Sequence, residues 1–420
     1  MYNYGKVEVD DVESEVTHIV KQTLDRGLSQ YGVLNFRIPA DDERFTDLTR
    51  IYMRVELEVT KGNGESLGDE DIVCLDQGGM HSLFSSCDVS FNGEVVSSMS
   101  QYPYSTLLCR LLGATERIRE DVWSSLDGSW GVYMDKDDLS TLAPALFYMQ
   151  NRASRKYNRV HFYGRIHSDV LMSSRQYLPP GVSLGVEMRR KNAAFSLIAP
   201  SGDFEVGILS ASIFVPRLRL SDTITHMAMS SVEGEVANLT FNRLETRMAN
   251  IAAAEPGWQW RNIVNYGPLP NRIYFALVPQ KAVYGTISRA SSYFDTLALS
   301  SFNVKLDGRD ILVDPMKMDF RYTDTGTIDI ENSDVKDGYM SIVNVLNYVA
   351  NQVEPVRITN SRFCMGGTIY AVELGRCGEK GGSVGVLDVE LTFGEGGCKE
   401  EACAFVFTEK TAHIPIKIRS

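Results

Sequence analysis

The chain has 420 residues, of which 44% are hydrophobic and 23% charged, and its formal net charge is −12 at pH 7. This length holds about two domains of roughly 200 residues, and the acidic balance argues against a nucleic-acid wrapper, which needs excess Lys and Arg. No run reaches the roughly 20 apolar residues of a membrane helix, and the chain does not begin with a secretory signal pattern. We therefore expect a folded protein with no transmembrane segment and no sequence-specific nucleic-acid binding.

The N-terminal segment 1–28 is acidic at first and then carries a loose helical stripe of apolar residues. The stripe consists of Val12, Val16, Ile19, Val20 and Leu24. We interpret 1–28 as an N-terminal arm or short helix. An arm that ties neighbouring copies together is the alternative.

Alternation of apolar and polar residues predicts strands through the rest of the first half. The clearest strand is 50–60, where Ile51, Met53 and Val55 point to one side of the strand. The expected strands are 31–39, 50–60, 160–166, 182–188, 194–198 and 207–215, and the expected helices are 102–112 and 116–126. A long loop, 128–159, contains the basic residues Arg152, Arg155, Lys156 and Arg159. These side chains are either solvated or contact an acidic neighbour or packaged nucleic acid.

A polar stretch, 216–222, reads as a linker to the second half. The expected strands there are 223–230, 236–247, 273–278, 300–306, 368–374, 384–393, 402–408 and 413–418, and 342–353 has helical spacing.

One hairpin pattern occurs twice. Alternating residues lead into Asn92-Gly93, which predicts a type I′ turn because both central positions of that turn need positive φ. The same pattern returns before Asp307-Gly308, and the two turn glycines are 308 − 93 = 215 residues apart. We therefore predict that these four residues are structural turns in equivalent places.

Two further pairs of similar segments (echoes) occur in the same order in the two halves: 50–53 resembles 272–275, and 181–188 resembles 385–392. Each half also has one helical segment after its hairpin. The sequence thus predicts an all-β chain of two tandem eight-stranded jelly-roll β-sandwiches with a few short helices in loops. We place jelly roll 1 at 29–221 and jelly roll 2 at 222–420.

No catalytic or cofactor-binding constellation emerges from the sequence. His161 and His167 have even spacing in a predicted strand region, so they either form a metal pair or lie on a solvent face. The acidic pair Asp137-Asp138 lies in a polar loop. The tryptophans either stack on sugars or anchor a core or interface; they are Trp123, Trp130, Trp258 and Trp260. We predict no enzyme activity, no cofactor and no metal.

The cysteines are odd in number and irregular in spacing, which predicts mostly reduced thiols made in a reducing compartment. They are Cys74, Cys87, Cys109, Cys364, Cys377, Cys398 and Cys403. A zinc site formed by the last four is one alternative, although no pair has the Cys-x₂-Cys spacing. The role of these four cysteines stays open.

Several short motifs, in this order and spacing, resemble double jelly-roll major capsid proteins of the Polinton (Maverick) and adintovirus type, relatives of the adenovirus hexon. The motifs are Phe36-Arg37-Ile38-Pro39, His81-Ser82-Leu83-Phe84-Ser85, Val89-Ser90-Phe91-Asn92-Gly93, Tyr102-Pro103-Tyr104, Leu178-Pro179, Phe195-Ser196-Leu197, Leu269-Pro270-Asn271-Arg272, Leu306-Asp307-Gly308 and Gly338-Tyr339. The Cys- and Gly-rich segment 375–403 departs from the pattern.

The resemblance implies a structural protein that forms trimeric, pseudo-hexagonal capsomers of an icosahedral shell. It also implies contacts with neighbouring capsomers and a penton-type single jelly-roll minor capsid protein. The expected location is the virion capsid, assembled inside the host cell. The alternative function is a tandem β-sandwich carbohydrate-binding protein or glycan hydrolase.

Overall fold

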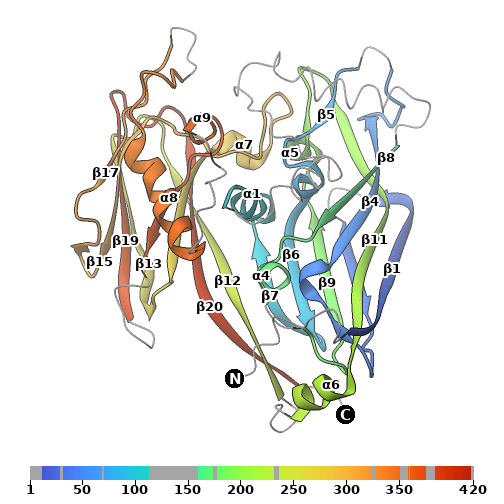
Figure 1. Ribbon diagram of the computed structural model, residues 1–420. Helices are drawn as coiled ribbons and strands as arrows, with labels where there is room; N and C mark the ends of the chain where they lie inside the picture. The colour runs from blue at the N-terminus through green and yellow to red at the C-terminus, as the bar shows by residue number, and fades with distance from the viewer. Residues whose placement is uncertain are drawn as a thin grey trace.

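The computed structural model describes residues 12–28, 32–68, 71–112, 159–173, 177–230, 236–323, 328–350, 358, 360–374 and 384–417. Figure 1 shows two β-sandwich lobes side by side, the first blue to green and the second yellow to red. Every strand that belongs to a named sheet pairs antiparallel with its neighbours.

The first lobe consists of two four-strand paths with two short additions. One sheet has the order β1-β11-β4-β8 and the other β2-β9-β6-β7. The strands are β1 (Val12–Leu28), β2 (Val33–Ile38), β4 (Tyr52–Lys61), β6 (Phe84–Phe91), β7 (Glu94–Ser100), β8 (Arg159–Arg165), β9 (Leu184–Arg190) and β11 (Phe204–Leu220). Short β3 (Phe45–Thr46) adds to β11, and β5 (Cys74–Leu75) pairs with β10 (Leu197–Ile198).

The second lobe repeats this arrangement with the orders β12-β20-β14-β18 and β13-β19-β15-β16. Its strands are β12 (Val236–Ile251), β13 (Gly257–Pro268), β14 (Arg272–Pro279), β15 (Leu299–Leu306), β16 (Arg309–Asp310), β18 (Tyr370–Glu373), β19 (Val384–Phe393) and β20 (Ala402–Lys417), and short β17 (Met316–Lys317) pairs with β15. When the eight main strands of each lobe are numbered 1 to 8 along the chain, the two sheets of both lobes have the strand orders 1-8-3-6 and 2-7-4-5. Two four-stranded antiparallel sheets in this order form a jelly roll, so the chain is a double jelly roll.

The three sequence echoes fall on equivalent strands. The echo pair 50–53 and 272–275 leads into β4 and β14, which are third in their sheets. The hairpin echo lies on β6 and β15, and the remaining echo on β9 and β19, which are both second in their sheets. The internal repeat is therefore structural as well as sequential.

Helices lie in the connections between strands. They are η2 (Leu48–Arg50), η3 (Gly79–Leu83), α1 (Tyr102–Leu112), α4 (Asp169–Ser173), α5 (Ala193–Ser196), α6 (Asp222–Ser230), α7 (Gln280–Tyr284), α8 (Lys336–Ala350) and α9 (Asn360–Cys364). The expected helix 102–112 matches α1, and α8 includes most of the expected helix 342–353. The expected helix 116–126 lies outside the described residues.

The core follows from strand periodicity. On β4, Met53, Val55, Leu57 and Val59 are buried while their polar neighbours are half-buried. The same alternation recurs on β19. Buried side chains from both lobes form one continuous hydrophobic cluster, which ties the lobes together.

The helical interpretation of residues 12–28 was wrong. They form β1, which pairs with β11 at the edge of the first sheet. The i, i+4, i+7 spacing of Val12, Val16 and Ile19 suits a helix, but a β-branched composition and a long partner strand favour the extended chain.

Three boundary predictions were also wrong. Most of the expected linker 216–222 belongs to β11, which continues to Leu220. Pro216 is tolerated in this strand because it lies between the residues that pair with β4, which end at Phe214, and those that pair with β3. The expected strand 223–230 is helix α6, and most of the expected strand 194–198 is helix α5. Asn192 begins α5 because its side chain accepts a hydrogen bond from the Phe195 N–H at 3.0 Å.

Candidate functional site

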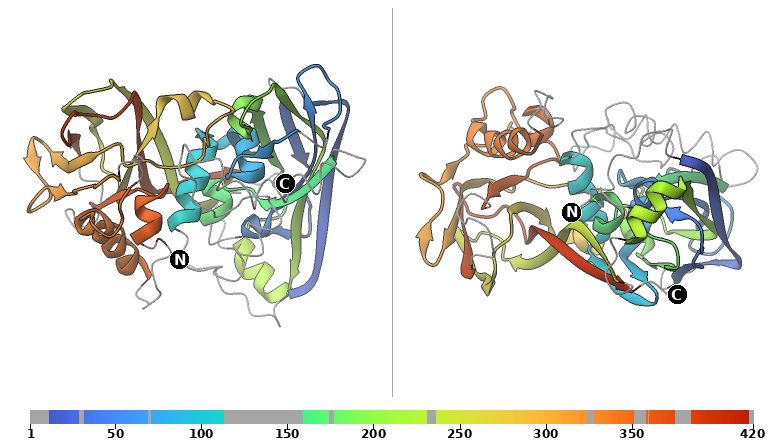
Figure 2. Two further views of the ribbon diagram at one scale, coloured as in Figure 1. Left: turned by 90° about the horizontal axis from the view of Figure 1, so that it is seen from above. Right: turned by 60° about the horizontal axis from the view of Figure 1, so that its bottom comes forward.

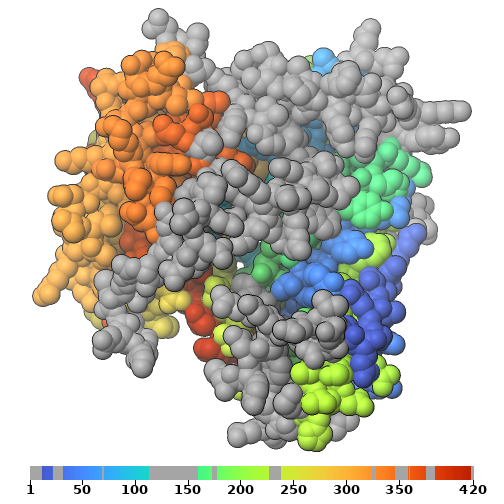
Figure 3. All heavy atoms as spheres, in the orientation of Figure 1, coloured from blue at the N-terminus to red at the C-terminus, as the bar shows by residue number. Residues whose placement is uncertain are grey.

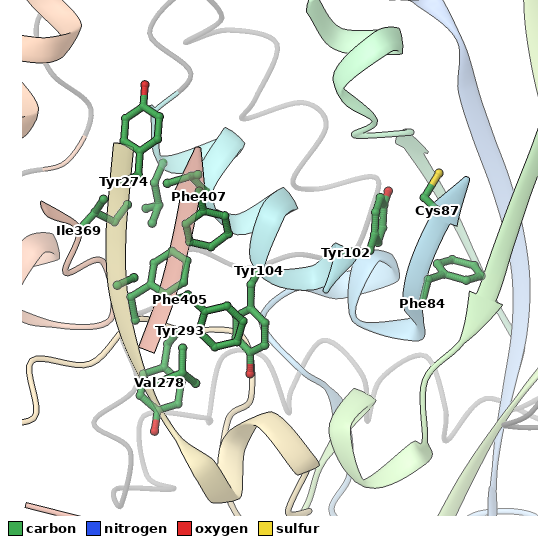
Figure 4. Close-up of a cluster of buried hydrophobic side chains, with 14 of the residues drawn as sticks. Phe84, Cys87, Tyr102, Tyr104, Tyr274, Val278, Tyr293, Ile369, Phe405 and Phe407 are labelled. Atoms are coloured by element: carbon green, nitrogen blue, oxygen red, sulfur yellow. The ribbon is translucent and has the colours of Figure 1, made fainter. Parts of the chain in front are cut away.

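The most elaborate site in the described structure is the interface between the two jelly rolls. Helix α1 lies there, directly after β7, and its two tyrosines point in opposite directions (Figure 4). Tyr102 points toward Phe84 and Cys87 of the first jelly roll, whereas Tyr104 points toward Phe405 of the second. One helix thus contributes to both cores.

Tyr104 anchors the second jelly roll to the first. Its side chain is fully buried, and its ring centroid lies 4.6 Å from that of Phe405 and 6.2 Å from that of Phe294. Its hydroxyl donates a hydrogen bond to the Ser291 carbonyl oxygen at 3.1 Å. Burial raises the pKa of Tyr104 well above its ordinary value, so the hydroxyl keeps its proton and remains a donor.

Asp76 forms a second connection. It is fully buried after β5, and its carboxylate accepts hydrogen bonds from Ser291 N–H at 2.7 Å and Ser292 N–H at 3.4 Å. A third comes from Gly78 N–H at 3.0 Å. Burial raises the pKa of Asp76, and the hydrogen bonds from Ser292, Ser291 and Gly78 oppose that rise. The carboxylate therefore fixes a loop of the second jelly roll against the first.

Asp169 holds the edge strand β12 in place. Its carboxylate accepts from the Ser97 hydroxyl, from Val170 N–H at 2.6 Å and, across the interface, from Leu244 N–H at 3.2 Å. Close by, Arg243 donates to the Val96 carbonyl oxygen at 2.7 Å. The outer edge of β12 thus rests on β7 and α4 of the first jelly roll.

The two predicted turns have matching geometry. Asn92, Gly93, Asp307 and Gly308 have φ of 50°, 86°, 51° and 77°, the positive values that a type I′ turn needs. The Asn92 side-chain oxygen accepts from Ser183 N–H at 2.9 Å, and its backbone N–H donates to the Ser183 carbonyl oxygen at 3.0 Å.

Asp307 makes the same pair of bonds with Val386, both at 2.8 Å. The first turn has two additional bonds, one of them from the Ser183 hydroxyl to the Asn92 side-chain oxygen at 3.1 Å. The Asn92 side-chain amide donates to the Lys417 carbonyl oxygen at 2.7 Å, at the end of β20. An aspartate could not donate this bond, so asparagine is the residue suited to the turn that meets the other jelly roll.

The two candidate histidines have separate surroundings. His161 is exposed on β8, with Nδ1 3.2 Å from an Arg54 guanidinium nitrogen. His167 follows β8 and its ring lies edge-on to that of His81, 4.9 Å between centroids. His81 Nδ1 is 3.1 Å from the Tyr102 hydroxyl, which also accepts from His167 N–H at 3.3 Å. His167 therefore belongs to the packing under α1.

The remaining candidates are dispersed. Cys364, Cys398 and Cys403 are buried thiols, and burial raises the pKa of each to about 11. Among the residues that the structure describes, no group of three or more His, Cys, Asp or Glu could hold a metal ion. Trp258 and Trp260 pack edge-on, 5.8 Å apart, on β13. The other candidates lie outside the described residues: Cys377, Trp123, Trp130, Asp137, Asp138, Arg152, Arg155 and Lys156.

Sequence reasoning missed the buried polar connections of the interface. Asp76 follows the apolar run Val73-Cys74-Leu75, and a carboxylate at the end of such a run was the available signal. Nothing in the sequence pairs Asp169 with β12, because 75 residues separate it from Leu244.

None of the described helices is long and apolar enough to cross a membrane. No protein-family model matches the chain, and no curated protein matches it either.

The fold does match solved structures over nearly its whole length. A chain in the cryo-electron-microscopy structure of the Sputnik virophage is 11% identical, with 99% of this chain and 91% of that chain covered and a TM-score of 0.60. The Faustovirus major capsid protein is 10% identical, with 96% and 91% covered and a TM-score of 0.55. The mavirus major capsid protein is 10% identical, with 100% and 95% covered and a TM-score of 0.50. This chain therefore shares its fold with viral major capsid proteins.

Proposed function

We propose that this protein is the major capsid protein of an icosahedral virus or virus-like element, with a structural and not an enzymatic role. The observation that carries the proposal is the repeat: one chain holds two jelly rolls of identical strand order, locked together by buried contacts. The fold shared with capsid proteins over nearly the whole chain supports it. The sequence motifs favour the Polinton and adintovirus type.

The proposed working form is a homotrimer. Three chains with two similar lobes each present six lobes around one axis, so a threefold object can fill a sixfold lattice position. A subunit with different surfaces on its two sides forms head-to-tail contacts, which close into rings when the rotation permits. An obligate interface of this kind buries at least about 2,000 Å².

The units that we assign are jelly roll 1 up to residue 221, including β1, which belongs to its first sheet, and jelly roll 2 at 222–420. Partners of the trimer are neighbouring capsomers and a penton-type single jelly-roll protein, and the location is the virion capsid, assembled inside the host cell. The net charge of −12 fits a shell that does not gather its genome through basic protein surfaces.

Electron microscopy of the purified full-length protein in negative stain tests the proposal. We expect particles with six lobes and threefold symmetry that pack into pseudo-hexagonal arrays. A two-lobed monomer that binds glycans would refute the capsid role and favour a carbohydrate-binding sandwich instead.

A further inference from the structure

The internal repeat makes β1 the counterpart of β12. Each is the first strand of its jelly roll and the edge strand of its sheet. The pairing register shows which residue of β1 corresponds to which residue of β12. Tyr52 and Tyr274 are equivalent in the sequence repeat, and each begins a row of residues that are paired across neighbouring strands. These rows are Tyr52, Phe214 and Ile19 in the first jelly roll, and Tyr274, Phe407 and Thr246 in the second. Ile19 therefore corresponds to Thr246, an offset of 246 − 19 = 227 residues.

The outer edge of β12 is occupied within the chain. Arg243 donates to the Val96 carbonyl, Leu244 N–H donates to Asp169, and the Thr246 hydroxyl lies 3.0 Å from the Ser105 hydroxyl. Two side chains and one backbone carbonyl of the first jelly roll thus contact this strand at three points along its edge.

Among the described residues, no strand pairs with the corresponding outer edge of β1. The same offset relates Arg243 to Val16 and Leu244 to Thr17. Val16 is 45% exposed and Ile19 55% exposed, and Thr17 is exposed as well. Figures 1 and 2 show β1 at the outer margin of the molecule, and the blue atoms of the N-terminal part lie on that surface in Figure 3. An edge strand with exposed apolar side chains is a site for another chain.

The opposite margin carries the matching surface. In the first jelly roll, β12 covers the strand that follows the Asn92-Gly93 turn, where Val96 and Ser97 are buried. Counting three and four residues from the turn glycines, their counterparts are Ile311 and Leu312, which are only half-buried, and Val313 beyond them is fully exposed. This segment, 311–313, leads toward β17, which lies at the far margin of the second lobe in Figure 1.

We propose that the outer edge of β1 at Val16, Thr17 and Ile19 docks on a second copy of this chain, with Val16 on segment 311–313 and Ile19 facing α8, the counterpart of α1. This contact between chains is equivalent to the packing of β12 on β7 within one chain. It joins opposite margins of the molecule, as a head-to-tail ring requires. Apolar Val16 replaces the polar Arg243, which fits its meeting with Ile311, Leu312 and Val313. This inference rests on the proposed trimer and specifies the surfaces that form it.

Cysteine cross-linking tests the contact in the full-length protein. The double variant Val16→Cys/Ile311→Cys, treated with a short bismaleimide, should give covalent dimers and trimers. Each single variant should give only the cross-links that native cysteines form. The two single variants and the double variant share this background. A double variant that still has the mass of a trimer but shows no cross-linking above that background would overturn the assigned surface and leave the capsomer proposal standing. A monomeric wild-type protein would overturn both.

A second variant measures the contribution of β1. Ile19→Glu should shift the concentration of half-dissociation upward by at least about tenfold, the effect of about 1.4 kcal/mol. Tyr284→Glu is the matched control, since Tyr284 is 59% exposed and lies on neither proposed surface. We expect both variants to keep the circular dichroism spectrum of the folded wild type. An equal loss of trimer in both, or none in Ile19→Glu, would contradict the role of β1.

Discussion

Removing the Tyr104 side chain should uncouple the two jelly rolls. Tyr104→Ala leaves a cavity where a fully buried aromatic ring stood, which costs about 3–5 kcal/mol in well-packed cores. Tyr104→Phe keeps the ring but leaves the buried Ser291 carbonyl without its hydroxyl donor, which costs about 1–3 kcal/mol. Chemical denaturation followed by circular dichroism measures both losses in the free energy of unfolding.

A double-mutant cycle isolates the contact across the interface. With ring centroids 4.6 Å apart, Tyr104 and Phe405 should show a coupling energy of about 0.5–1.5 kcal/mol when both are changed to Ala. Phe36 is an equally buried aromatic on β2, and changing it together with Tyr104 should give additive losses. If Tyr104→Ala costs less than about 1 kcal/mol, or if Phe405 and Phe36 couple to it equally, Tyr104 is not the anchor described above.

Three further perturbations test other parts of the structure. Asn92→Asp keeps the turn but loses the amide donor to the end of β20, so it should lose about 1 kcal/mol, while Asp307→Asn should be near neutral; thermal melts compare them. Gly93→Val and Gly308→Val should each lower the melting temperature, since a β-branched residue is strained at φ of 86° or 77°, and an unchanged melt would refute that. Burial raises the pKa of Asp169, so the folded protein holds that proton more tightly than the unfolded chain; stability from this group is therefore lost as pH rises from about 4 through the raised pKa. Asp169→Asn should remove this part of the pH dependence of urea midpoints, and identical profiles would contradict it.

The sequence predicted the fold through repetition. The Asn92-Gly93 and Asp307-Gly308 turns, with the echo at 50–53 and 272–275, identified equivalent strands because turn chemistry and alternation are local signals. Residues 12–28 were misjudged because their spacing suits a helix, and only the partner β11 makes them a strand.

The interface between the jelly rolls was beyond the reach of local patterns. Asp76 meets Ser291 across 215 residues, and Asp169 meets Leu244 across 75. Such pairs depend on how the two lobes pack, which neither periodicity nor composition records. The repeat recovers part of this information, because each contact inside the chain suggests its counterpart between chains.

Sedimentation equilibrium of the purified full-length protein measures its mass in solution and so tests the trimer. We expect 3 × 46.9 kDa, about 141 kDa, at micromolar concentration. A species of 46.9 kDa that persists as the concentration is raised would contradict it.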